Sequence, residues 1–470
     1  MGILSAALNR FEQFLDSQFL LFRCPQSQTE GDVLASIDVS GCRPLARGPS
    51  QGCQLYAMSG GARSERDTIG RPLVHRAAFK QCTGEALYLD DIPLSQGELF
   101  LGLVTSKRAH ARLLSVDLSP ARGMPGVIEV IDYSDVPQLN EWETLELVFA
   151  SDKVSHEGQV IAAVVAETHA QAQRAAHSVK VTYEDLEPVV TIKDAIARNS
   201  LYPFDIKVDT GDVRSALAQC EYTVSGEMSV SAQEHLYLEP HGCVVYPRDG
   251  EELEKALMRV LGLPANKIVV KVKRLGGGFG GKETRNVTVL LPAAVAAMKT
   301  NRPVRAVLDR DEDMRMTGTR HPAYVTYKIG FDSEGKILAL DADLYLNMGH
   351  SVDLSPAVLE TALLGIDSSY NIKNFRVRGH LCLTNLTSCT AFRGFGGPQA
   401  IIMAENWVTH VAEHLGLSQE AVRERNFYKD GDTIPCGQML KSCNVTRCWE
   451  ECIRKSQFDS RLETVNQFNR

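Results

Sequence analysis

The residues best suited to chemistry form a glycine-rich run, Gly276-Gly277-Gly278-Phe279-Gly280-Gly281, followed directly by Lys282 and Glu283. Glycine adopts backbone conformations that other residues avoid, and the absence of a side chain lets a ligand contact the main chain. Successive N–H groups exposed in this way can bind an anion or a metal-bound oxygen. The run therefore predicts a binding loop, and a purely structural glycine turn is the simpler alternative.

A second glycine loop covers residues 391–399, with the sequence Ala-Phe-Arg-Gly-Phe-Gly-Gly-Pro-Gln. Arg393 offers a planar fork of donors that suits an oxyanion or a phosphate. Phe395 can form a flat wall against a planar ligand. Taken alone, this loop fits an ordinary connection into a helix equally well, but two such loops in one domain favour a shared site.

A third candidate segment is Gln233-Glu234-His235-Leu236-Tyr237-Leu238-Glu239. Polar and apolar residues alternate in it, which predicts a strand with its polar residues on one face. From that face the amide of Gln233 could reach a ligand. A strand face exposed to solvent, without a ligand, is the alternative.

The first glycine loop also matches the dinucleotide-binding pattern GxGxxG through Gly276, Gly278 and Gly281. A strand is expected at 268–272, a helical stretch follows, and a further strand at 304–308 precedes Asp309. Two features disagree with this pattern. The acidic residue lies farther along than the usual distance of about 20 residues, and Pro292 should interrupt the helix. NAD binding remains an alternative at this stage.

The elements that must position these residues fall into segments. Residues 1–69 read as an amphipathic helix, with apolar residues from Leu8 to Phe22, followed by a linker or arm. Strand and helix patterns alternate over 82–190, including a buried strand at 159–166. Residues 200–204 look like a seam to a larger unit at 196–450. In that unit we expect a helix over 398–415, with Ile401 and Ile402 on its buried side, and another helix capped by Ser418. Residues 451–470 begin a further, truncated part.

Composition sets broader limits. The chain has 470 residues, of which 44% are hydrophobic and 23% charged, and a formal net charge of −8. These values are typical of a soluble globular protein and exclude disorder over most of the length. An acidic chain is a poor candidate for binding nucleic acid or an anionic membrane. No apolar run reaches the roughly 20 residues of a membrane-spanning helix. With no secretory signal and no CxxC pair among the 12 cysteines, we expect a cytoplasmic protein with free, buried thiols.

From about Thr68 to Arg470 the chain resembles the molybdenum-cofactor region of the xanthine dehydrogenase and aldehyde oxidase family. The resemblance is carried by several motifs in the family's order: QEHLYLE, RLGGGFGGKETR, LDRDEDM, TGTRHP and TNLTSCTAFRGFGGPQ. It implies an α+β fold, with an α/β hammerhead domain at roughly 82–190. The first molybdenum-cofactor-binding domain follows at 196–450, and the second is truncated.

The resemblance also implies an activity, the oxidative hydroxylation of purines (hypoxanthine to xanthine to urate) or of related heterocycles and aldehydes. Gln233, Phe279 and Arg393 match positions that surround the molybdenum and its molybdopterin. Glu283 and Phe395 match positions that orient and sandwich a purine, which favours the xanthine dehydrogenase branch. Family members pass electrons through two [2Fe–2S] clusters and FAD, and they form dimers.

Departures from the family pattern change these expectations. Thr361 stands where purine enzymes carry an arginine, which puts the substrate in doubt. A strand and a Ser/Thr-Gln loop are missing after residues 244–247. The iron–sulfur and flavin regions, and the catalytic glutamate of a Gly-Glu-Pro-Pro motif, do not occur in this sequence. We therefore expect the chain alone to hold the cofactor weakly and to turn over nothing. The alternative is a non-catalytic fragment that pairs with a full-length subunit.

Overall fold

The computed structural model describes residues 74–247, 255–264 and 267–470. The chain divides into two units, Met1–Phe79 and Lys80–Arg470. The amphipathic helix and the arm expected within residues 1–69 lie outside the described residues. All described strands, and all described helices except α2, lie wholly within the second unit.

One five-stranded sheet combines strands from both predicted domains, in the order β11-β12-β1-β7-β3. Its strands are β1 (Leu99–Thr105), β3 (Val127–Asp132), β7 (Val160–Ala166), β11 (Gly242–Val245) and β12 (Val304–Val307). β1 runs antiparallel to β7 and parallel to β12, with Leu99 opposite Val304. The sheet therefore crosses the boundary that the sequence predicts near residue 196.

Strand β7 is buried along its whole length, as its continuous apolar sequence predicts. Its alternate residues enter different cores. Val164 packs with Ala175 of helix α4 (His169–Ser178), and Val165 packs with Val295 of helix α8 (Val287–Thr300). Helix α4 lies close against β1. A Cβ on Gly102 of β1 would lie 2.5 Å from the carbonyl oxygen of Ala172 in α4.

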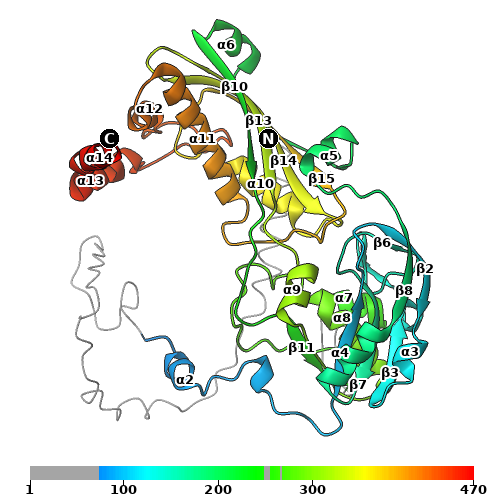
Figure 1. Cartoon of the computed structure of the whole chain (residues 1–470). Helices are drawn as coiled ribbons and strands as arrows, with labels where there is room; N and C mark the ends of the chain where they lie inside the picture. The colour runs from blue at the N-terminus through cyan, green and yellow to red at the C-terminus, as the bar shows by residue number, and fades with distance from the viewer. Residues whose placement is uncertain (1–73, 248–254, 265–266) are drawn as a thin grey trace, which may run out of the picture. The chain divides into compact units, whose positions relative to one another are not determined.

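A second five-stranded sheet has the order β10-β13-β14-β15-β9. Its strands are β9 (Leu201–Thr210), β10 (Tyr222–Val230), β13 (Ala323–Phe331), β14 (Ile337–Gly349) and β15 (Asn374–Leu383). β13 and β14 pair antiparallel, whereas β14 and β15 are parallel. Helices α10 (Ser355–Gly365) and α11 (Gly397–Leu415) pack against this sheet, and Trp407 lies in the core that they share (Figure 1).

Shorter elements complete the unit. A three-stranded sheet contains β6 (Lys153–Val154), β2 (Ala111–Asp117) and β8 (Lys180–Asp185), and a hairpin contains β4 (Glu141–Glu143) and β5 (Glu146–Leu147). The short helices are α2 (Ala78–Thr83), η2 (Leu89–Asp91), α3 (Ser119–Arg122), η3 (Tyr133–Asp135), α5 (Ile192–Ala197), α6 (Val213–Gln219), α7 (Lys255–Leu261) and α9 (Arg310–Met316). Helices α12 (Gln419–Asn426), α13 (Val445–Ser456) and α14 (Phe458–Asn469) follow α11.

Predictions for the helices near the C-terminal end hold, with one exception. The Ser418 hydroxyl caps α12 by accepting a hydrogen bond of 3.2 Å from the Ala421 N–H. Helix α11 has the predicted bounds to within a residue, but Ile401 and Ile402 are 50% and 46% exposed. The buried face of α11 instead carries Ala400, Met403, Ala404, Trp407, Val408, Val411 and Ala412.

Four predictions about strands, a domain seam and a helix are wrong. Residues 233–239 and 268–272 form no strand, and residues 201–204 belong to β9 instead of a seam. Pro292 lies buried inside a continuous helix α8 instead of interrupting it. The tertiary packing of α8 outweighs the loss of one backbone N–H. Val269, Val270 and Val272 are 39%, 43% and 63% exposed.

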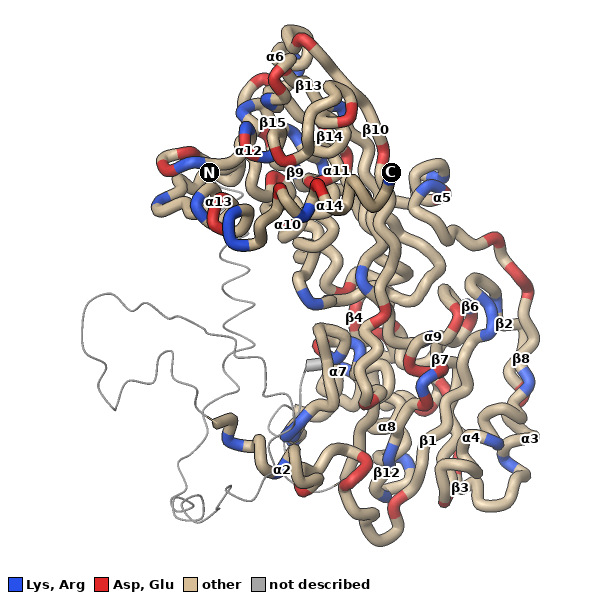
Figure 2. The backbone as a smooth tube through the Cα atoms, turned by 60° about the vertical axis from the view of Figure 1, so that its left-hand side comes forward, with Lys and Arg blue, Asp and Glu red and all other residues tan. Residues whose placement is uncertain are grey.

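Charges are mixed along the described chain, and Figure 2 shows acidic and basic residues interspersed along the tube. Among the described residues, no helix combines the length and the apolar character needed to cross a membrane.

A buried ion cluster joins the two predicted domains. The Arg285 guanidinium, 1% exposed, donates to Glu146 Oε1 at 2.5 Å and to Asp353 Oδ2 at 3.2 Å. Ser351 Oγ donates to the same Glu146 oxygen at 2.6 Å. Burial alone would raise the pKa of Glu146, but the charges and hydrogen bonds of Arg285 and His350 together outweigh it and hold this pKa well below its usual range. Removing one charge would leave the others buried without compensation.

We expect Glu146→Gln to lower the free energy of unfolding by about 3 kcal/mol at neutral pH, because Arg285 loses a buried partner. Urea unfolding measures this change. Because the folded pKa of Glu146 is depressed, the stabilisation is present above the unfolded pKa of about 4.3. The difference between wild type and variant should therefore shrink as the pH falls below that value.

The matched control is Glu184→Gln, which breaks the exposed Arg112–Glu184 pair of 3.0 Å. Exposed pairs contribute less than about 1 kcal/mol. Equal losses in the two variants would contradict a special role for the buried cluster.

Candidate functional site

The two glycine loops meet in the structure. The Arg393 N–H donates a hydrogen bond of 2.9 Å to the carbonyl oxygen of Phe279. A Cβ on Gly280, whose φ is +99°, would lie 2.5 Å from the carbonyl oxygen of Ala391. Phe279 itself has a φ of 51° and is 48% exposed. Glycine at 280 is therefore required twice, once by the backbone conformation and once by the contact.

His235 supports this junction from the segment between β10 and β11. Its Nε2 lies 2.8 Å from the carbonyl oxygen of Ala391, so this nitrogen carries the proton and donates. Its ring stacks on Phe392 with centroids 4.5 Å apart. Burial lowers the pKa of His235, which favours the neutral ring. The alternation in this segment thus buries His235 and Tyr237, although no strand forms.

Arg320 connects Gln233 to the second glycine loop. Its Nε donates to Gln233 Oε1 at 2.6 Å and its Nη2 donates to the carbonyl oxygen of Arg393 at 2.8 Å. The guanidinium also lies 4.1 Å from the centroid of the Phe392 ring. Because arginine can only donate, the Gln233 oxygen is the engaged atom, and the NH₂ group of this exposed residue has no hydrogen-bond partner among the described residues.

The sequence reasoning missed Arg320. The residue belongs to the TGTRHP motif, which carries the family resemblance, but no spacing indicates its contact with Gln233. It is 5% exposed, and its Nη1 has no hydrogen-bond partner among the described residues. A buried arginine is costly unless it is paired, so a buried arginine with a free N–H group indicates a functional site.

A second buried network lies under the first loop. His241 is 2.8 Å from Asp313 Oδ1 through its Nδ1 and 3.1 Å from the Gly281 carbonyl oxygen through its Nε2. The Tyr237 hydroxyl is 2.9 Å from the same Nδ1. Burial alone would raise the pKa of Asp313, but the hydrogen bonds from His241 outweigh it and lower this pKa. The network fixes the end of the glycine run.

Lys282 also fixes the first glycine loop in place. Its Nζ donates to the Glu239 carbonyl oxygen at 2.6 Å and lies 3.2 Å from Glu239 Oε2, which also accepts from the Gly276 N–H at 2.7 Å. The ammonium group therefore holds the two ends of the loop and is not directed at a ligand.

The remaining predicted site residues lie on the same loops or on the helix behind them. The Glu283 N–H donates to the Gly280 carbonyl oxygen at 3.0 Å. Surrounding protein and, to a lesser extent, the charge of Asp353 raise the pKa of Glu283. Phe395 has a φ of 45° and packs against the core beside α10.

Thr361 lies on α10, which the second loop approaches closely: a Cβ on Gly396 would be 2.3 Å from the carbonyl oxygen of Val358. The Thr361 hydroxyl donates to the Ala357 carbonyl oxygen at 2.9 Å, within its own helix. It therefore adds neither a charge nor an unused donor.

The NAD-binding alternative disagrees with the structure. That motif needs a strand directly before the glycines and a helix directly after them. Residues 268–275 form no paired strand, and α8 begins only at Val287. The GxGxxG match is therefore coincidental.

The fold and the site define a class of protein: an α+β chain in which two glycine loops are joined by a backbone hydrogen bond. Two family models match it. Residues 83–187 match the a/b hammerhead domain of aldehyde oxidase and xanthine dehydrogenase, and residues 192–427 match the molybdopterin cofactor-binding domain. The chain belongs to this molybdenum-hydroxylase family, and the predicted order of its two domains is confirmed.

Individual relatives agree with this assignment. The chain is 46% identical over 437 residues to the xanthine dehydrogenase/oxidase of Felis catus, covering 90% of this chain and 33% of that protein. It is 43% identical over 434 residues to aldehyde oxidase 2 of Macaca fascicularis, covering 89% of this chain and 32% of that protein. The aldehyde oxidoreductase of Desulfovibrio gigas superposes with a TM-score of 0.78 at 28% identity, covering 83% of this chain and 47% of that one. The chain thus spans about a third of the length of the curated relatives it matches.

We expect Gly280→Ala to destabilise the protein by at least about 1–3 kcal/mol, because the new Cβ meets strained backbone and a carbonyl oxygen. Gly397→Ala is the control, since a Cβ there meets nothing within 4 Å. Thermal unfolding compares the two variants. A similar melting temperature for both would show that the loops do not touch in solution.

Arg320→Met should lower the free energy of unfolding by about 1–3 kcal/mol in total, because the hydrogen bonds to Gln233 and Arg393 are both lost. Arg315→Met, which removes a side chain that is 55% exposed, should have little effect. Urea unfolding measures stability, and hydrogen exchange of the Arg393 amide reports on the junction. Unchanged exchange in Arg320→Met would argue against the connection.

Proposed function

We propose that the two glycine loops and Gln233 bind a molybdenum–molybdopterin cofactor, and that the site serves the oxidative hydroxylation of a small heterocycle or aldehyde. The hydrogen bond from Arg393 to Phe279 carries this proposal, because it brings both loops to one place. When bound, the cofactor supplies a two-electron oxidation at carbon.

The residues fit such a group. The NH₂ group of Gln233 can donate to an anionic oxygen, and Arg320 prevents the amide from turning its oxygen there instead. At Gly280 the missing Cβ lets the two loops touch, whereas a Cβ on Gly278 or Gly397 would meet no atom closer than 3.7 Å, so the backbone there is open to a ligand. The Arg393 side chain is exposed and adds a positive charge beside an anionic cofactor. Donors fixed before the ligand arrives bind it without the cost of reorganisation.

For the substrate we propose a purine or a related heterocycle. Glu283 supports this choice, because a carboxylate can accept hydrogen bonds from ring N–H groups, and a raised pKa keeps it able to donate to a higher pH than usual. Phe395 offers a flat apolar surface for stacking. Thr361 supplies no charge to an oxygen that becomes negative during the reaction, so we propose weaker stabilisation than in enzymes with a cation there.

We further propose that the chain alone does not turn over substrate. The Gly-Glu-Pro-Pro motif and the iron–sulfur cysteine spacing are not found in this sequence, so neither a general base of that kind nor an electron path is supplied. Pairing with a full-length subunit, or with a second copy, is the non-catalytic alternative. The free cysteines among the described residues support a reducing, cytoplasmic location.

The test of cofactor binding is the molybdenum and pterin content of the chain purified from cells that make the cofactor. We expect content above that of an unrelated chain from the same cells, and a clear reduction in Gln233→Ala and Arg393→Ala. Arg315→Ala should leave it unchanged. Wild-type content at the background level would contradict the proposal.

Substrate preference is tested by titrating hypoxanthine and benzaldehyde into the cofactor-loaded chain. Glu283→Leu should weaken hypoxanthine binding by about tenfold, roughly 1.4 kcal/mol, and leave benzaldehyde unaffected. Equal effects on both would argue against a purine. Oxidation of hypoxanthine by the chain alone would overturn the claim of inactivity.

A further inference from the structure

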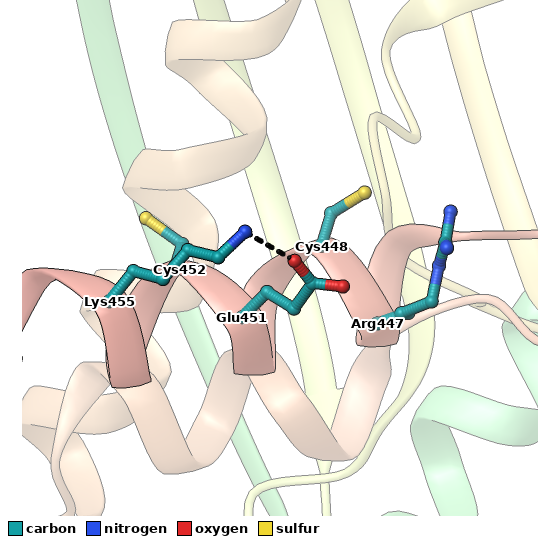
Figure 3. A pocket seen from close by; sticks show the side chains of 5 residues that line it. All are labelled: Arg447, Cys448, Glu451, Cys452 and Lys455. Carbon is teal, nitrogen blue, oxygen red and sulfur yellow. Dashed lines mark hydrogen bonds and ion pairs between the residues drawn. The ribbon is translucent and has the colours of Figure 1, made fainter. Parts of the chain in front are cut away.

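Helix α13 carries two thiols outside the glycine-loop site. Cys448 and Cys452 are both exposed, which differs from the buried thiols that the sequence predicts, and they are four positions apart. Both line a hollow of about 380 Å³ together with Arg447, Glu451 and Lys455. Figure 3 shows the two thiols on one side of the helix, with their sulfur atoms turned apart.

Helix geometry brings these thiols within reach of one ligand. Residues four apart on a helix have Cβ atoms about 5–6 Å from each other. Taking the zinc–sulfur bond of roughly 2.3 Å as a guide, a cation bonded linearly to two sulfurs needs them about 4.6 Å apart. Exposed side chains exchange rotamers within nanoseconds, so both sulfurs can turn toward each other without any backbone movement.

The same geometry disfavours a disulfide between the two cysteines. A disulfide requires Cβ atoms about 3.5–4.5 Å apart, which is closer than an intact helix places them. Oxidation would have to distort α13. The two cysteines are therefore poorly placed to form a disulfide with each other.

Ligand number selects the kind of metal. Among the described residues, no group of three or more His, Cys, Asp or Glu side chains is arranged to hold a metal ion. Zinc, which takes four ligands in structural sites, is thus a poor match. Thiolates select soft ions such as Cu(I), which two sulfurs can satisfy.

The charges around the pair suit such a complex. Two thiolates and one monovalent cation carry one net negative charge. The lining has Arg447 and Lys455 against one acid, Glu451, whose Oε2 lies 2.7 Å from Lys455 Nζ. The surroundings therefore carry one net positive charge, opposite to that of the complex.

We propose that Cys448 and Cys452 form a two-thiolate site for a soft monovalent cation, with Cu(I) as the representative ion. Two sulfur–metal bonds form, and the two thiol protons pass to solvent. The site is independent of the proposed molybdenum chemistry.

The test is a titration of the full chain with Cu(I) under anaerobic conditions, in competition with a chromophoric Cu(I) chelator. Because the two sulfurs act as one chelate, we expect Cys448→Ser and Cys452→Ser each to weaken binding of one Cu(I) by about a hundredfold or more. The double variant should be no weaker than either single one. Trp449, next to Cys448, reports by fluorescence on binding at this helix.

Two control variants distinguish the positions of the thiols from their number. Cys436→Ser removes another cysteine and should change nothing. Cys452→Ser combined with Glu450→Cys keeps the thiol count but moves one sulfur to another face of α13, and it should bind as weakly as Cys452→Ser. Tight binding retained by that variant, or by both single serine variants, would overturn the proposal, as would wild-type chain that loses all Cu(I) to the chelator.

Discussion

The close approach of two stretches of backbone is the constraint on which the site depends. The backbone at Gly280 lies so near the backbone at Ala391 that a Cβ on Gly280 would collide with the Ala391 carbonyl oxygen. Both loops take unusual backbone conformations near that contact. Phe279 in the first loop and Phe395 in the second have left-handed backbone angles. The cost of those angles, on the order of 1–3 kcal/mol each, must be met by surrounding contacts.

Those surrounding contacts are mainly buried polar groups. His235, Arg320, His241 and Lys282 each bond to backbone carbonyl oxygens of the loops or of the residues beside them. A carbonyl oxygen that is buried without a donor is expensive, so each of these side chains supplies a donor that the loop backbone does not supply itself. The loops are thus held in their conformation by side chains that come from other segments.

The sequence was most informative where one interaction dominates. A continuous apolar run predicted β7, and a serine at a helix start predicted α12, because burial and capping act locally. Both glycine loops were also recognisable, since few roles other than close approach need so many glycines. The expected strand at 233–239 failed because alternation also arises where single residues, here His235 and Tyr237, fill pockets between other segments. Arg320 was missed for a related reason: its partners are far away in sequence, and no local pattern records them.

The sheet that contains both β1 and β12 limits how recombination can exchange this part of the molecule. The pairing of Leu99 with Val304 and the buried contact of Arg285 with Glu146 both cross the boundary between the two family models. A recombination event at that boundary would leave one half with a bare sheet edge and the other with an uncompensated buried charge. The hammerhead and cofactor-binding segments are therefore separate as sequence signatures but a single unit for evolutionary exchange.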